Sequence, residues 1–453
     1  MKPVLLLLNP PYRLPVMRDY YCSSTSKAGY LWPPIDLICQ SGFLTPHYDL
    51  RLIDAPTESL LAEATLRRIA VEPPAIIYSL VGTAAYPDDF AFLQRVSDQF
   101  GCRIFISGDV ARFYPQWILD HHPFIEGLLL NFATPALRDY LVQGTKNCEA
   151  LALRNEKAET APQAASDFNY PIPAHGLFHS LPYRMPFLGR PFGSVLTNYG
   201  CPFRCDFCNS CRIGYCERER DNLFEELDFF RSSGIKHLFV KDMTFNPSAR
   251  RAIMLLEEWR EKKFDFNWTG YFRAEQIDAE LAALLKKTSC RMAQIGIETA
   301  NQQVLEEHKP GANLEEAIRG MNRLKQAGVP YGAHFIFGLP GDNSHGFART
   351  IDFARQAGLS YASFNLFTPR LGSNSAPDSP EPARLQMDPS RPLGGEAAFM
   401  ADLDRWVRKA NVAFYLRPGY LLSVARSAIS ARSFFSALAI GWRFLRAGLR
   451  SKQ

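Results

Sequence analysis

The chain has 453 residues, of which 47% are hydrophobic, and its formal net charge is +5. This length allows two or three domains with cores of their own, and the composition is that of an ordinary globular protein. The ten cysteines are partly clustered and no cleavable signal pattern follows Met1. We therefore expect a reducing cytoplasm and exclude a disulfide scaffold. No apolar stretch reaches membrane-spanning length, which excludes an integral membrane protein.

The first 145 residues predict a domain of their own. Short apolar runs alternate there with helical stretches, and they occupy residues 4–8, 50–54, 75–80, 103–107 and 125–130. Buried strands that alternate with helices indicate a small doubly wound, Rossmann-like α/β domain. Residues 146–190 are mixed and rich in turn formers, so we interpret them as a linker. The pair His121-His122 falls at a helix end and is best explained as solvated or capping.

The most informative motif is Cys201-Pro-Phe-Arg-Cys205-Asp-Phe-Cys208. Three cysteines at this spacing can hold three irons of a 4Fe-4S cluster and leave the fourth iron open, since thiolates are the usual cluster ligands. A zinc site normally needs a second Cys-x-x-Cys knuckle, and none follows at the expected distance. Ordinary buried thiols are a further alternative. Spacing alone also allows a complete electron-carrying cluster, in which Cys205, Cys208 and Cys211 keep a Cys-x-x-Cys-x-x-Cys spacing and Cys216 is the fourth ligand.

The segment that follows the motif predicts six strand–helix units. The strands are expected at residues 193–198, 236–241, 266–271, 291–297, 331–337 and 361–365, with helices such as 221–231 and 314–327 between them. Repeated strand–helix units imply a parallel sheet, and right-handed crossovers would curl it into an incomplete barrel. Ligands of such a barrel bind at the carboxyl ends of the strands.

From about residue 193 to residue 370 the chain resembles the radical S-adenosylmethionine enzymes, in the branch that carries a cobalamin-binding domain. The resemblance rests on the cysteine motif and on five later segments. They are Lys241-Asp-Met-Thr-Phe245, Trp268-Thr-Gly-Tyr-Phe-Arg273, Gly296-Ile-Glu-Thr-Ala300, Phe335-Ile-Phe-Gly-Leu-Pro-Gly341 and Ser363-Phe-Asn-Leu-Phe-Thr-Pro-Arg370. The resemblance implies a partial (β/α)6 barrel with a 4Fe-4S cluster and S-adenosylmethionine as cofactors.

The resemblance also assigns residues to these two cofactors. Cys201, Cys205 and Cys208 are expected to bind the cluster, while Cys211 and Cys216 are not. Contacts to S-adenosylmethionine are expected from Phe207, Asp242, Thr244, Arg273, Gly296, Glu298, Gly338 and Pro340. Each has an ordinary alternative: an isolated Asp after a strand is often a helix cap, an isolated Glu is usually a surface charge, and a glycine allows close backbone approach.

The first domain resembles the cobalamin-binding domain of the same branch. The expected cobalamin contacts follow its strands, and they are Asn9, Pro10, Pro11, Ser79, Gly82, Thr83 and Gly108. The chain departs from the pattern in lacking the Asp-x-His-x-x-Gly motif, in having Gly108-Asp109 after the fourth strand and Asn131-Phe-Ala-Thr134 after the fifth. A degenerate domain without cofactor therefore stays open beside cobalamin binding without a protein imidazole.

Residues 376–453 are expected to form a proline-rich connector and a basic amphipathic helical tail. No acidic residue follows Asp404, and an apolar stripe with steps of three and four runs from Leu421 to Leu449, flanked by Arg432, Arg443 and Arg450. Such a helix can lie at a membrane surface. Packing on the protein itself is the alternative. Nucleic acid is not an expected partner, because no aromatic and basic binding module accompanies the charge.

The leading functional hypothesis is a cobalamin-dependent radical S-adenosylmethionine methyltransferase that acts on an unactivated carbon. The alternatives are a radical rearrangement, cyclisation or oxidation of an isoprenoid, lipid or tetrapyrrole, and a non-enzymatic electron-transfer protein. The expected partners are a small-molecule substrate, with a lipid-like molecule among the candidates, and an electron donor such as flavodoxin or ferredoxin. The expected location is the cytoplasm, with peripheral membrane contact through the tail.

Overall fold

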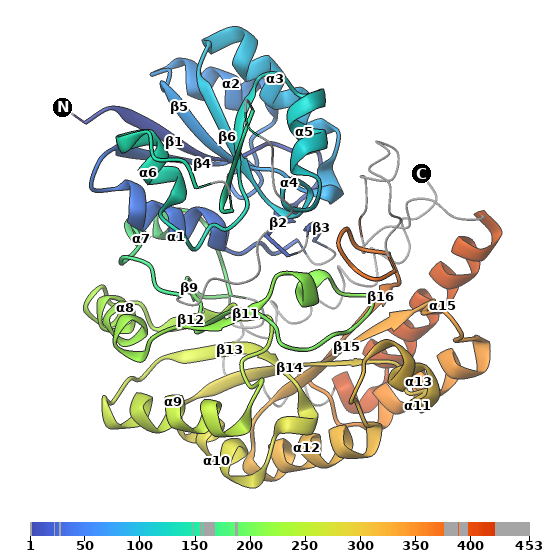
Figure 1. Ribbon diagram of the computed structural model, residues 1–453. Coiled ribbons are helices and arrows are strands. Elements are labelled where there is room, and N and C mark those ends of the chain that lie inside the picture. Colours follow the sequence, from blue (N-terminus) through green and yellow to red (C-terminus); the bar gives the residue numbers. More distant parts are fainter. Residues whose placement is uncertain are drawn as a thin grey trace.

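The computed structural model shows two α/β units, one from each half of the chain, stacked against each other (Figure 1). Each unit is built on a six-stranded sheet. The structure describes residues 2–21, 23–26, 29–147, 149–154, 156, 168–185, 189–375, 388 and 397–421.

The first sheet has the strand order β4-β1-β5-β6-β7-β8. The strands are β1 (Val4–Asn9), β4 (Asp49–Asp54), β5 (Ile76–Leu80), β6 (Arg103–Ser107), β7 (Ile125–Leu129) and β8 (Leu151–Leu153). The first five are parallel, and β8 runs antiparallel to β7. The strand order reverses between β1 and β5, which confirms the doubly wound class and puts its crevice at the carboxyl ends of these two strands.

Helices cover both faces of this sheet (Figure 1). They are α1 (Ile35–Leu44), α2 (Ala62–Ala70), α3 (Asp88–Phe100), α4 (Asp109–Phe113), α5 (Pro115–His121) and α6 (Ala136–Gln143). All ten residues of α1 are buried, so this helix is covered on every side. A short hairpin, β2 (Val16–Arg18) and β3 (Ser23–Thr25), follows β1 and faces the second unit.

The segment predicted as a linker adds structure to the first unit. It contributes β8 to the sheet and helix α7 (His175–His179). Phe168 and Tyr170 are buried in the same apolar cluster as the strands β1 and β5. The domain boundaries therefore stay a prediction, because the chain between the two sheets packs with the first of them.

The second sheet has the strand order β16-β15-β14-β13-β12-β9, and all neighbours are parallel. The strands are β9 (Gly193–Val195), β12 (His237–Val240), β13 (Asn267–Phe272), β14 (Cys290–Glu298), β15 (Tyr331–Phe337) and β16 (Tyr361–Leu366). The order follows the chain, so each strand is added beside the previous one. This confirms the predicted partial (β/α)6 barrel.

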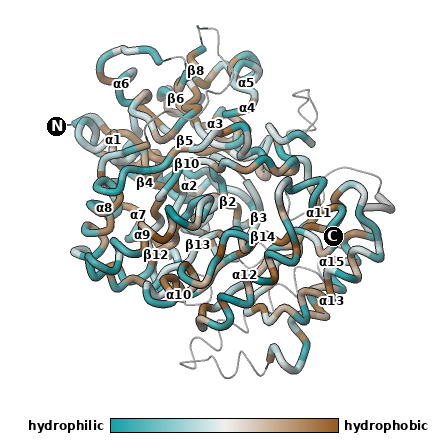
Figure 2. Tube along the Cα trace, turned by 60° about the horizontal axis from the view of Figure 1, so that its bottom comes forward, coloured by the Kyte–Doolittle hydropathy of each residue, from teal (hydrophilic) through white to brown (hydrophobic). Residues whose placement is uncertain are grey.

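The helices of the second unit lie on the outer side of its sheet (Figure 1). They are α8 (Arg220–Ser232), α9 (Ala249–Glu261), α10 (Ala279–Lys287), α11 (Gln302–His308), α12 (Leu314–Ala327) and α13 (Ser344–Gln356). In Figure 2, α10 and α12 alternate between hydrophilic and hydrophobic residues, as expected for helices with one face on a core. Their buried residues include Leu281, Leu285 and Leu324.

The first predicted strand of the barrel, residues 193–198, is divided in two. β9 ends at Val195, and Asn198 begins β10 (Asn198–Gly200), which pairs antiparallel with β11 (Tyr215–Glu217). The division arises because Asp242 accepts hydrogen bonds from the backbone nitrogens of Thr197 and Asn198, at 2.7 and 3.2 Å. The chain turns out of the sheet there, and the cysteine motif lies between β10 and β11.

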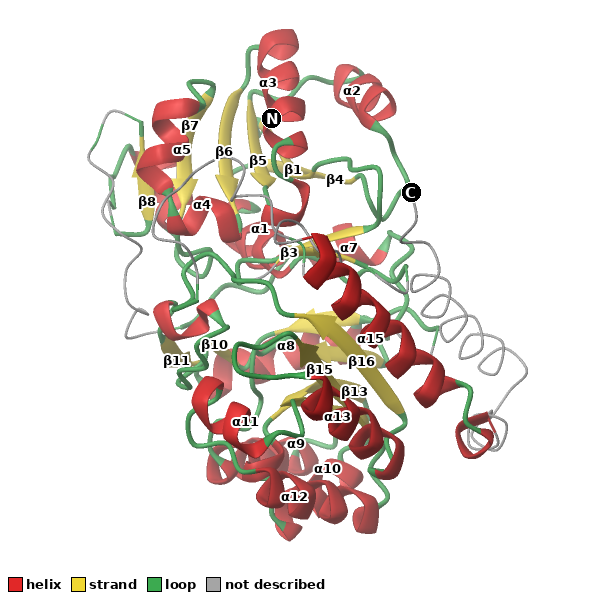
Figure 3. Ribbon diagram, turned by 90° about the vertical axis from the view of Figure 1, so that its right-hand side faces the viewer, coloured by secondary structure: helices red, strands yellow, loops and turns green. Residues whose placement is uncertain are grey.

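Helix α15 (Ala397–Tyr415) lies along β15 and β16 at the edge of the barrel (Figure 3). The Tyr415 hydroxyl donates to the carbonyl oxygen of Ala362 at 2.6 Å. The predicted apolar stripe begins at Leu421, whose surface is 43% exposed, and the rest of it lies outside the described residues. Within the described residues no helix is both long and apolar enough to span a membrane.

Candidate cluster and cofactor site

The cysteine motif forms a loop at the carboxyl end of the first barrel strand. The loop is closed at its base by a hydrogen bond from the Cys201 nitrogen to the Gly214 oxygen at 3.1 Å. Gly200 before it has a φ of 69°, and a Cβ at this position would lie 1.8 Å from the Gly214 oxygen. Only glycine fits there. Cys201 is buried, and Cys205 and Cys208 are half-buried.

Cys201 and Cys205 favour the neutral thiol when no metal is bound. Burial raises the pKa of Cys201 and of Cys205, and the nearby Cys208 raises both further. Lys309 and Arg273 act in the opposite direction on Cys205. Within the described residues no three ligating side chains converge on the position of a single ion. Thiolates that bind separate corner irons are the usual protein ligands of a cuboidal cluster.

Arg273 ends β13 beside the cysteine loop. Its guanidinium lies over the ring of Phe203, 3.9 Å from the ring centroid. The residue is 5% exposed, and its Nε and Nη1 have no hydrogen-bond partner among the described residues. Asn246 fixes the backbone, accepting from the Arg273 nitrogen at 2.9 Å and donating to its oxygen at 3.0 Å. Two buried donors of a positively charged group are therefore presented near the cysteines, which suits a carboxylate.

A second charged group lies at the end of β14. Lys309 Nζ donates to the Gly296 oxygen at 2.5 Å and lies 3.9 Å from Oε1 of both Glu275 and Glu298. Glu298 has a φ of 68°, in the left-handed region that is unfavourable for a residue with a Cβ. Burial raises the pKa of Glu298, while Lys309 lowers it. A strained acidic residue at a strand end is typical of functional sites.

His308 anchors the cysteine loop through contacts that no sequence pattern predicted. His308, the last residue of α11, has Nδ1 at 2.6 Å from the Asp206 carboxylate and Nε2 at 2.8 Å from the Pro340 oxygen. The Asp206 nitrogen also donates to the His308 oxygen at 3.0 Å. The loop is thus tied to the ends of α11 and β15. No spacing in the sequence joins these three distant positions.

The remaining residues nominated for S-adenosylmethionine lie at the same edge but differ in their contacts. Asp242 is fully buried and also accepts from the Thr197 hydroxyl at 2.5 Å and the Asn198 amide at 3.1 Å. The Thr244 hydroxyl lies 3.7 Å from Cys201 Sγ. Gly338 has a φ of 88° and approaches α15, where a Cβ would lie 2.6 Å from a Leu403 methyl.

Cys216 is buried in β11, and its thiol donates to the Glu217 oxygen at 3.6 Å. This contact fits a packed thiol that does not ligate. The side chain of Cys211 lies outside the described residues. The exclusion of both cysteines from the cluster stays a prediction.

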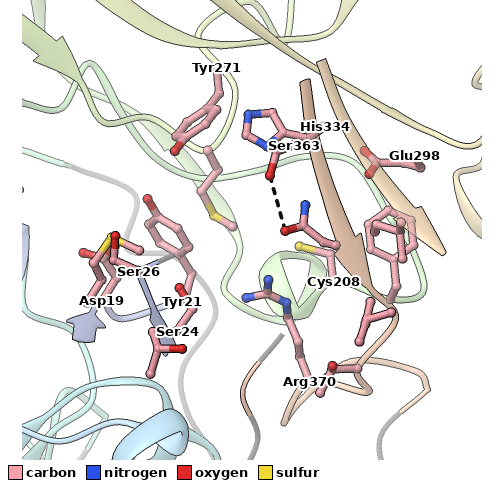
Figure 4. Close-up of a pocket in the computed structure, with 18 of the residues that line it drawn as sticks. Asp19, Tyr21, Ser24, Ser26, Cys208, Tyr271, Glu298, His334, Ser363 and Arg370 are labelled. Atoms are coloured by element: carbon pink, nitrogen blue, oxygen red, sulfur yellow. Dashed lines mark hydrogen bonds between the residues drawn. The ribbon is translucent and has the colours of Figure 1, made fainter. Parts of the chain in front are cut away.

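A cavity of about 330 Å³ opens beside the cysteine loop, between the barrel and the hairpin β2–β3. Figure 4 shows Asp19, Tyr21, Ser24 and Ser26 of the hairpin on one side and Tyr271, His334, Ser363 and Glu298 of the barrel on the other. Phe207 and Cys208 of the cysteine loop also line it. A molecule in this cavity would therefore contact both units and the loop.

The loops nominated for cobalamin contact the hairpin. Arg18 donates to both carboxylate oxygens of Asp89, at 2.8 and 2.5 Å, and both side chains are fully buried. Arg18 also donates to Asn9 Oδ1 at 2.8 Å and to the Pro10 oxygen at 3.0 Å. The Gly82 nitrogen donates to Asp89 at 2.9 Å. These polar groups are used within the protein at the crevice between β1 and β5.

Asp109 makes a similar set of contacts after β6. It accepts from the Ser23 nitrogen at 3.0 Å, the Thr83 nitrogen at 3.0 Å and the Thr83 hydroxyl at 2.7 Å. Gly108 has a φ of 127°, and a Cβ there would lie 2.0 Å from the Val81 oxygen. The Asp at the position where a second glycine was expected therefore holds the hairpin. As folded, these groups hydrogen-bond to one another and to the hairpin.

An incomplete parallel barrel with a cysteine loop after its first strand defines the class of this protein. Residues 195–354 match the family model of the Radical SAM superfamily. The match lies in the second unit and runs from the end of β9 to α13.

Relatives and solved structures extend the similarity to the whole chain. An uncharacterized methyltransferase of Pyrococcus horikoshii is 25% identical over 92% of this chain and 94% of its own. The radical S-adenosylmethionine methyltransferase TsrM from Kitasatospora setae, solved with cobalamin and a 4Fe-4S cluster, has a TM-score of 0.66 at 15% identity and covers 98% of this chain and 99% of that one. The cobalamin-dependent enzyme OxsB was solved with aqua-cobalamin and S-adenosylmethionine. It has a TM-score of 0.60 at 16% identity, and the match covers 78% of this chain and 52% of that one. These structures share the fold of both units.

Proposed function

We propose that this protein is a radical S-adenosylmethionine methyltransferase acting on a small molecule held between its two units. The observation that carries the proposal is the shared edge of the barrel: the cysteine loop lines the cavity there, and beside the loop lie two Arg273 nitrogens that have no partner among the described residues. Methyltransferases are named among the relatives and fold neighbours. With cluster and S-adenosylmethionine bound, the site would supply a 5'-deoxyadenosyl radical to the substrate.

The chain's own residues would bind and orient these groups. Cys201, Cys205 and Cys208 would bind the cluster, and Arg273 would donate to the carboxylate of S-adenosylmethionine. Glu298 lines the cavity beside the loop and would accept a hydrogen bond from a cofactor hydroxyl or amine. Asp242 accepts hydrogen bonds from Thr197 and Asn198, so we assign it to positioning the cysteine loop rather than to contact with S-adenosylmethionine.

Iron content and cofactor cleavage test this proposal together. The chain is reconstituted anaerobically with iron and sulfide, reduced with dithionite and analysed for iron and for 5'-deoxyadenosine. Cys205→Ala should lose the cluster and all cleavage, whereas Cys216→Ala should keep both. Full iron in Cys205→Ala, or loss of iron in Cys216→Ala, would reject the ligand set. Bound iron without any cleavage of S-adenosylmethionine would instead favour an electron-transfer protein.

Cobalamin is the methyl carrier that we propose, supported by the two fold neighbours that were solved with it. In the nominated loops, the Asn9 side chain and the backbone nitrogens of Gly82 and Thr83 already bind Arg18, Asp89 and Asp109. We therefore assign no step to those residues. Protein loaded with hydroxocobalamin and desalted should retain cobalt and show a spectrum without ligation by a protein imidazole. Loss of all cobalt on desalting would remove cobalamin from the proposal.

The tail is proposed to bring the enzyme to an anionic membrane surface, where a lipid-like substrate would be reached. The support is the sequence from Leu421 to Leu449, with its apolar stripe and arginines. Each basic residue near anionic lipid contributes about 1 kcal/mol. The full chain should float with anionic vesicles at low salt, and a chain ending at Arg417 should stay below. Equal flotation of the full and the shortened chain would leave the tail as a helix packed on the protein.

A small electron carrier such as flavodoxin or ferredoxin is the proposed reductant.

A further inference from the structure

The hairpin wall of the cavity contains a buried ion pair between the two units. Asp19 follows β2, and its Oδ2 lies 2.9 Å from Lys241 Nζ at the end of β12. The two side chains are 2% and 1% exposed. Trp32 Nε1 donates to the same oxygen at 3.1 Å. One oxygen of the carboxylate thus receives two donors, which fixes the orientation of the group.

The other oxygen of this carboxylate, Oδ1, accepts no hydrogen bond from the described residues. Asp19 Oδ1 is buried and has no hydrogen-bond partner among the described residues, and Asp19 lines the cavity. A buried acceptor without a donor is unfavourable, so an occupant that donates a hydrogen bond is favoured at this place. The charge of Asp19 is already balanced by Lys241. The donor therefore need not be a cation, and an anionic group at this end would be repelled.

The walls next to Asp19 are aromatic and thioether groups. Tyr21, Tyr271 and Trp32 line the cavity together with Met17 and Met243. Lys241 Nζ lies 3.9 Å from the Trp32 ring centroid and 5.2 Å from that of Tyr21, so these rings surround the ion pair. Such walls favour an apolar body, and flat rings pack well on them.

The cavity also fixes where the occupant lies relative to the chemistry. Asp19 lies on the hairpin side and Cys208 belongs to the cysteine loop, and both line the same volume of about 330 Å³ (Figure 4). This volume is at the small end of ligand pockets. A molecule anchored at Asp19 would extend toward the loop.

We propose that the substrate is a flat, largely apolar molecule that donates an N–H or O–H hydrogen bond to Asp19. This inference rests on the proposed function, because it takes the cavity as the place where the substrate meets the cofactors. Asp19 is the specificity-determining group, Lys241 and Trp32 hold it in place, and the ring walls bind the apolar body.

Three isosteric probes test the donor requirement. Indole carries an N–H donor, benzofuran an acceptor and indene neither. Their dissociation constants are measured by equilibrium dialysis against the full chain, reconstituted anaerobically in the presence of S-adenosylmethionine. Indole should bind at least about tenfold more tightly than indene and benzofuran, since a hydrogen bond to a charged acceptor is among the strong ones. Equal binding of indole and indene would overturn the proposal.

Variants separate the role of Asp19 from general packing. In Asp19→Asn the amide oxygen would face Lys241 and the amide N–H would face the cavity, so the preference should reverse toward benzofuran. Trp32→Phe removes one donor to Oδ2 but leaves Lys241 bound to that oxygen, so a reduced indole preference should remain. An indole preference that survives in Asp19→Asn would contradict the proposal. If Asp19→Asn does not fold, the three probes on the native chain still decide.

The two proposals can fail separately. Formation of 5'-deoxyadenosine by the reduced native chain tests the proposed function and needs no substrate. An indole preference without this activity would retain the donor site but reject the enzyme class. Formation of 5'-deoxyadenosine without an indole preference would retain the enzyme class but reject the donor site.

Discussion

His308 contacts the cysteine loop through Asp206 and lies outside the cavity lining. Both of its ring nitrogens face groups that accept hydrogen bonds, the Asp206 carboxylate and the Pro340 carbonyl. Burial lowers the pKa of His308, but the bonds to Pro340 and Asp206 raise it above its ordinary value. The geometry therefore favours an imidazolium paired with Asp206, one residue after Cys205. A fixed cation and a fixed anion lie beside the proposed cluster.

Charge substitutions in this pair should move the reduction potential of the cluster in opposite directions. His308→Gln removes a positive charge and should lower the midpoint potential, because the reduced cluster carries more negative charge. Asp206→Asn removes a negative charge and should raise it. We expect shifts on the order of 50 mV, close to the tenfold change in a one-electron equilibrium. Redox titration followed by electron paramagnetic resonance measures both.

The sign of the two shifts separates an electrostatic role from an anchoring role. If His308 and Asp206 only hold the loop, the two variants should loosen it alike and shift the potential in the same direction. Arg204→Gln, in the same loop, is a control for a charge that makes none of these bonds.

Sequence alone predicted the cysteines, because their spacing is local. The residues Asp19, His308 and Lys309 were not predicted, since their roles arise only when distant strand ends meet. Lys309, for example, lies 13 residues from the Gly296 oxygen that it binds, with a helix between them. Asp242 was predicted for its place at a strand end, but its partners Thr197 and Asn198 could not be read from any pattern.

At the scale of elements, α1 is a helix buried on every side that carries an acidic residue. Asp36 in its first turn accepts from the Tyr20 nitrogen at 3.2 Å and the Ser107 hydroxyl at 3.1 Å. Burial raises the pKa of Asp36 to about 8, and the charge of Asp19 raises it as well. The folded state thus keeps this carboxyl protonated at neutral pH.

Asp36 should make the protein less stable as pH rises. Its folded pKa exceeds the unfolded value of 3.8, so the folded state binds the extra proton between pH 4 and pH 8. Stability is therefore lost as pH rises through this window. Asp36→Asn should abolish this loss and raise the free energy of unfolding at pH 8 by up to ~5 kcal/mol. Urea unfolding at several pH values measures it, with exposed Asp49→Asn as control. If the free energy of unfolding depends on pH in the same way in Asp36→Asn and in the native chain, Asp36 is already ionised in the folded state.

The long elements were predictable and the short ones were not. Helix 314–327 and strand 331–337 coincide with α12 and β15, because their apolar periodicity is sustained. The hairpin β2–β3 was missed. Each of its strands has three residues, and it is held by Arg18 and by the bond of Ser23 to Asp109. Elements this short depend on tertiary contacts, which carry no periodic signal.

At the scale of the whole molecule, the two units share one apolar cluster. It contains Leu5 of β1 together with Tyr199 and Phe239 of the second unit. Tyr199 is 2% exposed and stacks on Tyr20 with ring centroids 5.2 Å apart, and its hydroxyl accepts from Arg112 at 2.9 Å. The Lys241–Asp19 pair adds a polar contact to the same interface. This continuity couples the stability of the units.

Unfolding of the full chain should therefore occur in one transition. Urea curves followed by far-ultraviolet circular dichroism and by tryptophan fluorescence should coincide, because neither unit can keep its core without the other. Tyr199→Ala should destabilise the whole chain by about 3–5 kcal/mol, the usual cost of truncating a buried aromatic residue. Met254→Ala, at a side chain 43% exposed on α9, should cost less than about 0.5 kcal/mol. Two separate transitions, with only one of them shifted by Tyr199→Ala, would instead mean that the units fold independently. The cavity between the units would then lack the fixed geometry that holds Asp19 opposite the cysteine loop.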